Sequence, residues 1–433
     1  MIPLRVPAGA RPDREGMGPG ERELMERFEV CQATRLVFGR STESEIGSLI
    51  KSCGGRRVLL VYGTRSASIS GLSGRILMSL DRAGIDHAEL GRVDSAARIA
   101  RVREGIALCR ELRLDFIVGL GGQAVADTAK AVAAGFHAAD DQLWELFTGQ
   151  TRIIRALPLG LIMTMNGQGG EIGDGCTLCG ESAEGGLRLQ AVAPCLRPAF
   201  AILNPELTTT LSLEQTASGM AGICARLLAS YLGPEGGMRL DDALAEGLLR
   251  SVCDAAHVLC EDPQDYAARS DLMWAGTLCH SGFMHAGRRR DATAELLSHC
   301  LASFYDVSLG RAMAVVLPAW LEFVQVRWQP RLAQLGANAL GCMLNFRDPG
   351  VTAAQALQRL RGLFNAMGLP GSLQELGGEA ADIPALLEHL QLYPVTGPAC
   401  AGLDISRSLH VEAILYTAAC YRRPQGSEVA AGW

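Results

Sequence analysis

The sequence predicts an α/β domain built on a mostly parallel sheet, followed by an all-helical domain. Three observations lead to this fold class. The chain has 433 residues, more than one compact core usually holds. Its first half alternates short apolar runs with helical stretches, the pattern of parallel strands covered by helices. From Ser212 onward the apolar spacing is helical and strand signals are nearly absent. We therefore expect an α/β domain over residues 25–208 and an all-helical domain over residues 209–423.

The strands expected in the first domain are short apolar runs, which is typical of buried strands. RVLLVYG ends in a glycine and DFIVGLGG runs into two more, so both lead into glycine turns. We expect strands at 57–63, 87–90, 115–122 and 156–164.

The helices expected between these strands have amphipathic or Ala-rich patterns. In the second helix, Ile99, Val102, Ile106, Leu108 and Leu112 are expected on one side. The third is rich in Ala and is expected to open on Asp127. These helices are expected at 71–84, 97–113 and 125–135.

Composition and charge narrow the classes of function. The formal net charge is −6 and no long basic stripe is present, so nucleic acid is not expected as a partner. The only tight basic cluster, at 288–290, is explained by a solvated or phosphate-facing turn. No uncharged apolar run reaches the roughly 18–20 residues that span a bilayer, and no signal peptide is evident. We expect no membrane association.

The cysteines and the two ends of the chain complete this picture. The 14 cysteines are scattered in apolar contexts, and we expect buried free thiols in a reducing cytoplasm. Residues 1–24 are rich in Pro, Gly, Arg and Glu, so we interpret them as a disordered extension, or as an upstream start with Met25 the natural one. Residues 424–433 are expected to be a disordered tail.

Several segments resemble the iron-containing (group III) alcohol dehydrogenase family, nearest its butanol dehydrogenase and NADPH-dependent aldehyde reductase branch. They include TRLVFG at 34–39, ALPLG at 156–160, DYAARSDLMWA at 265–275 and SFYD at 303–306. The resemblance spans roughly residues 28–420. It implies a Rossmann-like nucleotide-binding domain and a helical domain in a dehydroquinate synthase-like arrangement. It also implies an NADP or NAD cofactor, a small aldehyde or alcohol substrate, and a homodimer.

The candidate cofactor site lies at glycine turns, where backbone amides and a helix dipole can hold a pyrophosphate. The family has Gly-Gly-Gly-Ser where this chain has Gly121, Gly122, Gln123 and Ala124, so a side chain replaces a close backbone approach. Asp127 matches the Asp of the helix that follows. By resemblance, the other cofactor-binding candidates are Gly63, Arg65, Ser66, Thr148, Thr164, Gly169 and Arg188.

Two of these candidates have alternative interpretations. Arg65 could face an adenosine 2′-phosphate, but a solvent-exposed turn arginine is the interpretation we favour. Arg188 takes the place of a lysine near the nicotinamide in relatives. The loop from Thr164 to Gly169 is glycine-rich here, and we expect it to be flexible.

The metal site is the main departure from the family pattern. Relatives hold a divalent iron or zinc with an Asp and a His four apart on one helix, and two later His ligands. Gly222, Arg226, Glu295 and Leu309 stand at these four positions. One carboxylate does not make a metal site, and a guanidinium repels a dication. We expect no iron or zinc.

Other residues near this site leave several roles open. Arg226 and Glu295 are expected to face each other as a buried ion pair, or Arg226 hydrogen-bonds a carbonyl or carboxylate ligand. His299 matches a cleft histidine that is not a ligand; a core role is favoured over catalysis. Cys176 and Cys179 form a lone C-x2-C, which is weak evidence for a metal or redox site. Candidates for a rearranged soft-metal site are Cys224, Cys279, His280, His285 and Cys300.

Three functions follow from these observations. The first is a degenerate family member, a pseudoenzyme that works by binding or assembly and keeps some nucleotide affinity. The second is a metal-independent NAD(P)H-linked aldehyde or alcohol oxidoreductase, with His299 as proton donor and Arg226 as electrophile. The third is a thiol-based redox or metal-handling protein that uses Cys176 and Cys179.

Overall fold

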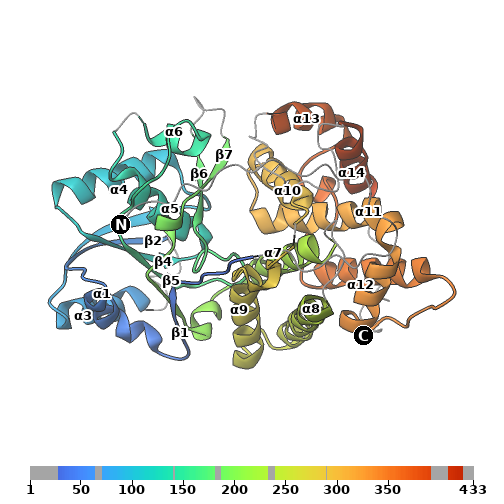
Figure 1. Ribbon diagram of the computed structural model, residues 1–433, viewed down its shortest axis with the longest axis horizontal. Helices are drawn as coiled ribbons and strands as arrows, with labels where there is room; N and C mark the ends of the chain where they lie inside the picture. The colour runs from blue at the N-terminus through green and yellow to red at the C-terminus, as the bar shows by residue number, and fades with distance from the viewer. Residues whose placement is uncertain are drawn as a thin grey trace.

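The computed structural model describes residues 28–63, 71–139, 142–180, 187–232, 239–288, 290–391 and 408–422. Within them, a sheet with helices on both faces occupies one side of the molecule and a group of helices the other (Figure 1). The change from strands to helices falls between residues 203 and 213.

The main sheet has six parallel strands in the order β1-β8-β5-β4-β2-β3. Its centre is fully apolar because helices cover both faces. Val58 and Leu60 face one layer while Leu59 and Val61 face the other, following the two-residue period of a strand. The strands are β1 (Arg35–Phe38), β2 (Arg57–Gly63), β3 (Asp86–Val93), β4 (Phe116–Gly121), β5 (Leu159–Met163) and β8 (Phe200–Leu203).

Among the described residues of this half there are five α-helices. α1 (Ile46–Ser52) and α3 (Leu72–Arg82) contribute to the core on one face, and α4 (Ile99–Glu111), α5 (Gln123–Gly135) and α6 (Leu143–Thr148) to the core on the other. Two predicted details were wrong. Leu112 is 45% exposed because α4 ends at Glu111, and Cys109 is buried on that helix instead. α5 begins at Gln123, so Asp127 lies inside it.

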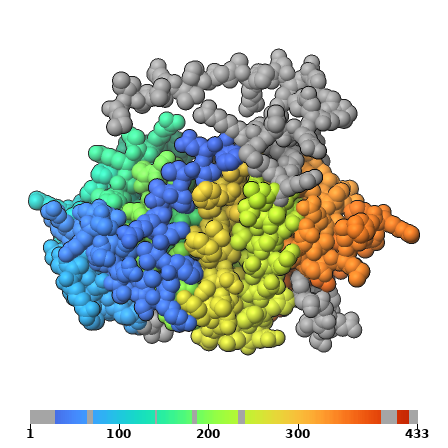
Figure 2. Space-filling view, turned by 60° about the horizontal axis from the view of Figure 1, so that its bottom comes forward, coloured from blue at the N-terminus to red at the C-terminus, as the bar shows by residue number. Residues whose placement is uncertain are grey.

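A small antiparallel hairpin reaches toward the helical half. It consists of β6 (Gly175–Cys179) and β7 (Arg188–Val192), and α5 packs against β6. At the other end of the sheet, the β1 segment lies along α9, as the blue and yellow surfaces of Figure 2 show. Phe38 stacks edge-on against Trp274, with 5.7 Å between ring centroids, and Arg40 lies over Tyr266.

The helical half packs around a single apolar core. α11 is its longest helix and is kinked at Trp328, just before Pro330. An 18-residue stretch of α11 is long and apolar enough to cross a membrane by composition alone, yet 67% of that stretch is buried inside the protein. The helices are α7 (Leu213–Tyr231), α8 (Arg239–Glu261), α9 (Tyr266–His280), α10 (Thr293–Phe304), α11 (Leu309–Ala339), α12 (Pro349–Ala366), α13 (Ile383–Gln391) and α14 (Ser408–Cys420).

Candidate functional site

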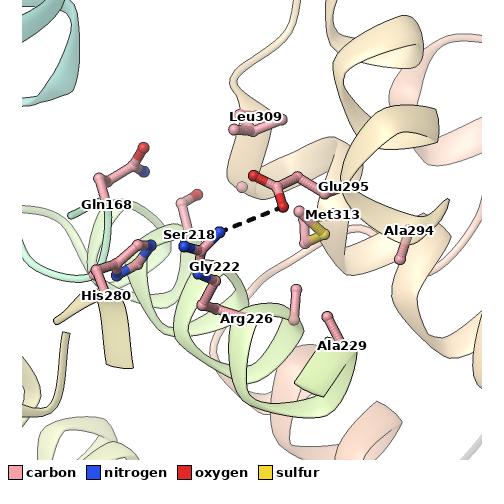
Figure 3. Close-up of a pocket in the computed structure, with 13 residues that line it drawn as sticks. Gln168, Ser218, Gly222, Arg226, Ala229, His280, Ala294, Glu295, Leu309 and Met313 are labelled. Carbon is pink, nitrogen blue, oxygen red and sulfur yellow. Dashed lines mark ion pairs between the residues drawn. The ribbon is translucent and has the colours of Figure 1, made fainter. Parts of the chain in front are cut away.

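The four positions at which the family resemblance places metal ligands line one small cavity of about 70 Å³ (Figure 3). α7 presents Gly222 and Arg226 one turn apart on the same helix face. α10 brings Glu295, and the first residue of α11 is Leu309. The rest of the lining has the polar residues Gln168, Ser218 and His280, and the small or apolar residues Gly167, Ala225, Ala229, Ala294, Gly310 and Met313.

The charged pair in this cavity is Arg226 and Glu295. Arg226 Nη1 lies 3.7 Å from Glu295 Oε2, a distance for an ion pair but too long for a hydrogen bond. Their side chains are 22% and 32% exposed, so the expectation of a buried bridge was wrong. Both side chains lie at the wall that the cavity shares with a larger cleft, and this position leaves them partly hydrated.

A second arginine, which the sequence analysis missed, also binds Glu295. Arg290 Nη1 donates a hydrogen bond of 3.1 Å to Glu295 Oε2. Its neighbour Arg288 is 5% exposed and forms ion pairs with Asp241 and Asp242. The basic cluster at 288–290 is therefore not simply a solvated turn. The signal that could have found Arg290 is its position five residues before Glu295, at the entry to α10.

His285, from the short 3-10 helix Phe283–His285, holds Arg226 from the other side. Arg226 Nε donates to His285 Nε2 at 3.1 Å, and Ser230 Oγ lies 2.5 Å from His285 Nδ1. Burial lowers the pKa of His285 to about 4, so the ring is neutral at pH 7. The hydrogen bond from Arg226 requires the tautomer with the proton on Nδ1, which is donated to Ser230 Oγ; in this tautomer Nε2 does not donate to Cys279 O, which lies 2.8 Å away.

The larger cleft has a volume of about 570 Å³ and lies between the two halves of the chain. It shares Gln168, Arg226, His280 and Glu295 with the small cavity, so the two spaces adjoin. The residues before β1, from Phe28 to Gln32, line part of it. His280 packs its ring against Gly169, and burial lowers the pKa of this histidine.

The glycine-rich loop after β5 is packed into the helical half, so the expectation of a flexible loop was wrong. A Cβ atom on Gly219 of α7 would lie 2.4 Å from Asn166 O, and one on Gly276 of α9 would lie 2.6 Å from Gly167 N. Just beyond the loop, the Glu171 carboxylate is buried and accepts a hydrogen bond from Thr277. Backbone lies directly on backbone here, which only glycine allows.

The turn before α5 is covered by side chains. A Cβ atom on Gly122 would lie 2.4 Å from Met165 Sδ, so Met165 covers this glycine. Gln123 lies over the first turn and donates a hydrogen bond of 2.9 Å to Asp127 Oδ1. Its own Oε1 is buried without a hydrogen-bond partner. These two side chains occupy the surface that a pyrophosphate contacts in a glycine-turn site, so the described residues fit that group poorly.

Asp127 lies inside the protein rather than at a ligand surface. It is 6% exposed and interacts with Gln123 and the backbone of Thr177. Burial raises its pKa to about 7 and lowers the pKa of Lys130, which donates to the carbonyl oxygens of Gly173 and Gly175. This pair attaches α5 to the β6–β7 hairpin.

The other cofactor-binding candidates within the described residues are spread over three places. Gly63, Gly121 and Thr164 lie near the carboxyl ends of adjacent strands β2, β4 and β5, the edge at which open α/β sheets bind ligands. Thr148 donates to Glu145 O of its own helix. Arg188 donates to Val307 O and Asp306 Oδ1 and thereby attaches the hairpin to the loop before α11. Arg65 and Ser66 lie outside the described residues.

His299 lies one turn beyond Glu295 on α10 and lines neither the small cavity nor the larger cleft, so its catalytic role stays a prediction. Burial lowers its pKa. The histidines that line the cleft are His280 and His285.

The Cys176 and Cys179 pair does not form a redox or metal site in this geometry. Both thiols are buried in β6, and residues three apart on a strand point to opposite faces about 10 Å apart. A disulfide needs Cα atoms within about 7 Å. Burial also raises the pKa of Cys176. The described residues contain no group of three or more His, Cys, Asp or Glu side chains placed to hold a metal, which leaves the alternative soft-metal site without support.

The replaced quartet does not fit the catalytic ion of the family. A catalytic zinc or iron site needs about three protein ligands, and the small cavity offers one carboxylate that already binds two guanidinium groups. His285 has Ser230 and Arg226 at its two ring nitrogens, and His280, which lines the small cavity, lies against Gly276 O with Nδ1 and so adds at most one ligand.

Comparison with known proteins identifies the family. Residues 33–205 match the model for iron-containing alcohol dehydrogenase, and residues 228–391 match the model for the C-terminal part of the Fe-containing alcohol dehydrogenase family. The NADH-dependent butanol dehydrogenase A of Clostridium acetobutylicum is 31% identical over 351 residues, which are 81% of this chain and 89% of that protein. The NADPH-dependent aldehyde reductase of Escherichia coli is 27% identical, covering 86% and 95% of the two chains.

Solved structures give the same answer for the fold. The crystal structure of NADH-dependent butanol dehydrogenase A from Thermotoga maritima superposes with a TM-score of 0.85 at 28% identity, covering 91% of this chain and 99% of that one. Matches in both halves, at this coverage and in this order, leave no other family to consider. The chain belongs to the iron-containing alcohol dehydrogenase family.

Proposed function

We propose that this chain keeps the family's fold but works without a catalytic divalent ion, as a ligand-binding pseudoenzyme. The observation that carries this proposal is the Arg226 guanidinium, 3.7 Å from the one carboxylate of the former metal cavity. A fixed cation at this position repels a dication, and Glu295 is already neutralised by two arginines.

The loss of the ion removes the main electrophile of the family's chemistry. In relatives the ion acts as a Lewis acid on the substrate oxygen during hydride transfer. Arg226 occupies that place and can donate hydrogen bonds to an oxygen, which is the observation that favours a metal-independent aldehyde or alcohol oxidoreductase as the second candidate. His299 does not line the cavity, so that candidate lacks its expected proton donor.

For the cofactor, we propose that the chain binds NADH or NADPH only weakly. The relatives named above are NADH- or NADPH-dependent. In this chain Met165 and Gln123 cover the turn that would hold the pyrophosphate, so we propose affinity well below that of an active dehydrogenase. A small aldehyde or alcohol remains the ligand class suggested by these relatives. A cytoplasmic homodimer also remains a proposal, which rests on the family resemblance.

Metal analysis of the purified protein tests the proposal directly. The protein is incubated with Fe(II) or Zn(II), desalted and measured by elemental analysis, with an active butanol dehydrogenase treated in parallel. We expect well under one ion per chain, against about one ion in the active enzyme. Stoichiometric metal that is lost in an Arg226 or Glu295 variant would overturn the proposal.

Two further assays separate the candidate functions. Titration with NADH, followed by its fluorescence, measures the cofactor site. Consumption of NADPH with short aldehydes, with and without added metal, measures catalysis. Turnover above background without metal would favour the second candidate over the pseudoenzyme.

A further inference from the structure

We infer that Arg226 and Arg290 form a binding site for the carboxylate of a short aliphatic acid, whose alkyl chain enters the small cavity beside Arg226. This inference rests on the proposed function, because a bound divalent ion would occupy the same position. It extends the proposed function by naming a class of ligand for the small cavity.

Two guanidinium groups compete for one carboxylate oxygen at this site. Arg290 takes Glu295 Oε2 at hydrogen-bond distance, whereas Arg226 lies 3.7 Å from the same oxygen. The Nε atom of Arg226 is bound to His285, which fixes the plane of the guanidinium. Figure 3 shows this guanidinium directed toward the middle of the cavity, next to Ser218 and Glu295. Its terminal nitrogens are therefore placed to form the parallel hydrogen bonds by which arginine recognises a carboxylate.

Where the small cavity meets the cleft, the guanidinium groups of Arg226 and Arg290 share the single carboxylate of Glu295, although the described lining of the cleft as a whole has three arginines and three acidic residues. Arg197, which also lines the cleft, is paired with Asp174 at 2.7 Å. Glu29 is exposed on the segment before β1 and lines the cleft but not the small cavity. Among the described residues of the small cavity, Glu295 is the single acidic side chain. An anionic ligand at Arg226 would balance the second guanidinium.

The wall behind Arg226 selects a ligand with a short apolar chain. Its apolar side chains are small or flexible, and the enclosed volume is about 70 Å³. This space suits an alkyl chain of a few carbons, and the burial of each CH₂ group favours binding. A neutral alcohol would fill the space but would leave the guanidinium unmatched. The apolar lining residues are Ala225, Ala229, Ala294, Leu309 and Met313.

Calorimetric titration of the full-length protein tests this inference with defined probes. Butyrate is the probe, butyramide is its uncharged counterpart of the same shape, and acetate and inorganic phosphate are anions without the alkyl chain. We expect saturable binding of butyrate, at least about tenfold weaker binding of butyramide, and weaker binding of acetate and phosphate than of butyrate.

Substitutions then locate the site. Arg226→Gln is expected to weaken butyrate binding about tenfold or more, and Arg226→Lys to restore part of the affinity as a point charge without the planar fork. Arg290→Gln is also expected to weaken binding, because Glu295 is then free to pair with Arg226. The effect should be smaller than that of Arg226→Gln, which removes the guanidinium that binds the ligand. Arg197→Gln, in the same cleft but paired with Asp174, is the matched control and should leave the affinity unchanged.

Three results would overturn the inference: no binding of butyrate, equal binding of butyramide, or an unchanged affinity in Arg226→Gln that remains folded by circular dichroism. Equal binding of acetate, phosphate and butyrate would show that the apolar cavity is not used and would also overturn it. Metal content is measured on the same samples. Metal-free protein that ignores butyrate refutes this inference alone, whereas stoichiometric metal refutes the proposed function.

Discussion

Arg226 Nε donates a hydrogen bond of 3.1 Å to His285 Nε2, so the guanidinium in the former metal cavity is held by a residue outside the four replaced positions. Ser230 lies at the other ring nitrogen, and the imidazole is thereby fixed at both ends. A charged side chain positioned in this way is organised for binding, in contrast to a solvated arginine whose rotamers are free.

Replacement of Arg226 by Ala should lower the free energy of unfolding by about 1–2 kcal/mol. A fully buried pair would cost more, but both partners are partly exposed and Glu295 keeps Arg290 as a partner. Urea unfolding at pH 7 measures the change, and Arg197→Ala serves as a comparison at a cleft pair of similar exposure. A loss above about 4 kcal/mol would mean that Arg226 supports the core.

Restoration of the quartet requires a fifth substitution. Gly222→Asp, Arg226→His, Glu295→His and Leu309→His recreate the ligand types but leave Arg290 without its carboxylate beside the ion. A Cβ atom on Gly222 also meets Gly167 O at 3.0 Å, so the loop must shift slightly. We expect the addition of Arg290→Gln to strengthen zinc binding at least about tenfold relative to the fourfold variant, because it removes a nearby positive charge. Competition with a chromogenic chelator measures both affinities, and equal affinities would show that Arg290 turns away from the ion.

Stability should decrease as the pH falls from about 6.5 to about 4, in part through His285. Its folded pKa of about 4 lies below its unfolded value of roughly 6.5. As the pH falls, the unfolded chain therefore binds the proton first, and protonation stabilises the unfolded state relative to the folded state. The contribution of His285 is full above about pH 6.5. His285→Gln should therefore flatten the difference between stabilities at pH 7 and pH 5. The exposed His87, replaced in the same way, is the control, and an equal effect of the two substitutions would contradict this assignment.

The turn before α5 should bind NADH more tightly once its covering side chains are removed. Met165→Ala with Gln123→Gly exposes Gly122 and the first amides of the helix. We expect about tenfold tighter binding in the NADH fluorescence titration, with Met78→Ala, an exposed methionine on α3, as the control. Unchanged affinity would show that the pyrophosphate does not bind at this turn.

Cys176 and Cys179 should stay reduced under mild oxidation. Both are buried on opposite faces of β6, and burial raises the pKa of Cys176, which disfavours its reactive thiolate. Thiol titration of the folded protein, before and after brief diamide treatment, should give the same number of reactive thiols in the wild type and in Cys176→Ser/Cys179→Ser. After unfolding, the variant should show two thiols fewer than the wild type. A disulfide between them, detected by mass spectrometry of the native protein, would contradict the geometry.

The sequence predicted the fold because its signals are local and repeated. Buried strands, Ala-rich helices and glycine turns each have their own periodicity, and the observed strands β2, β4 and β5 lie where apolar runs predicted them. The facing of Arg226 and Glu295 was also predictable, since both occupy positions that converge on one ion in the family.

The rest of the site depends on side-chain direction, which periodicity does not give. The contact of Arg290 with Glu295 and that of His285 with Arg226 cross from loops to helices that are distant in the chain. The covering of Gly122 by Met165 depends on how the loop after β5 turns. A run of glycines in a sequence suggests mobility, yet here Gly167 lies against the backbone of Gly219, and Gly169 lies against the ring of His280.

That contact limits how far the two halves can move relative to each other. Loop 164–170 follows β5 of the sheet, but the peptide groups of Asn166 and Gly167 rest on Gly219 of α7 and Gly276 of α9 with no side chain between them. A rigid seam of this kind resists rotation about a hinge and ties the melting of the sheet to the melting of the helices. We expect one cooperative calorimetric transition. We also expect the cleft between the two halves to keep the same width when a ligand enters it.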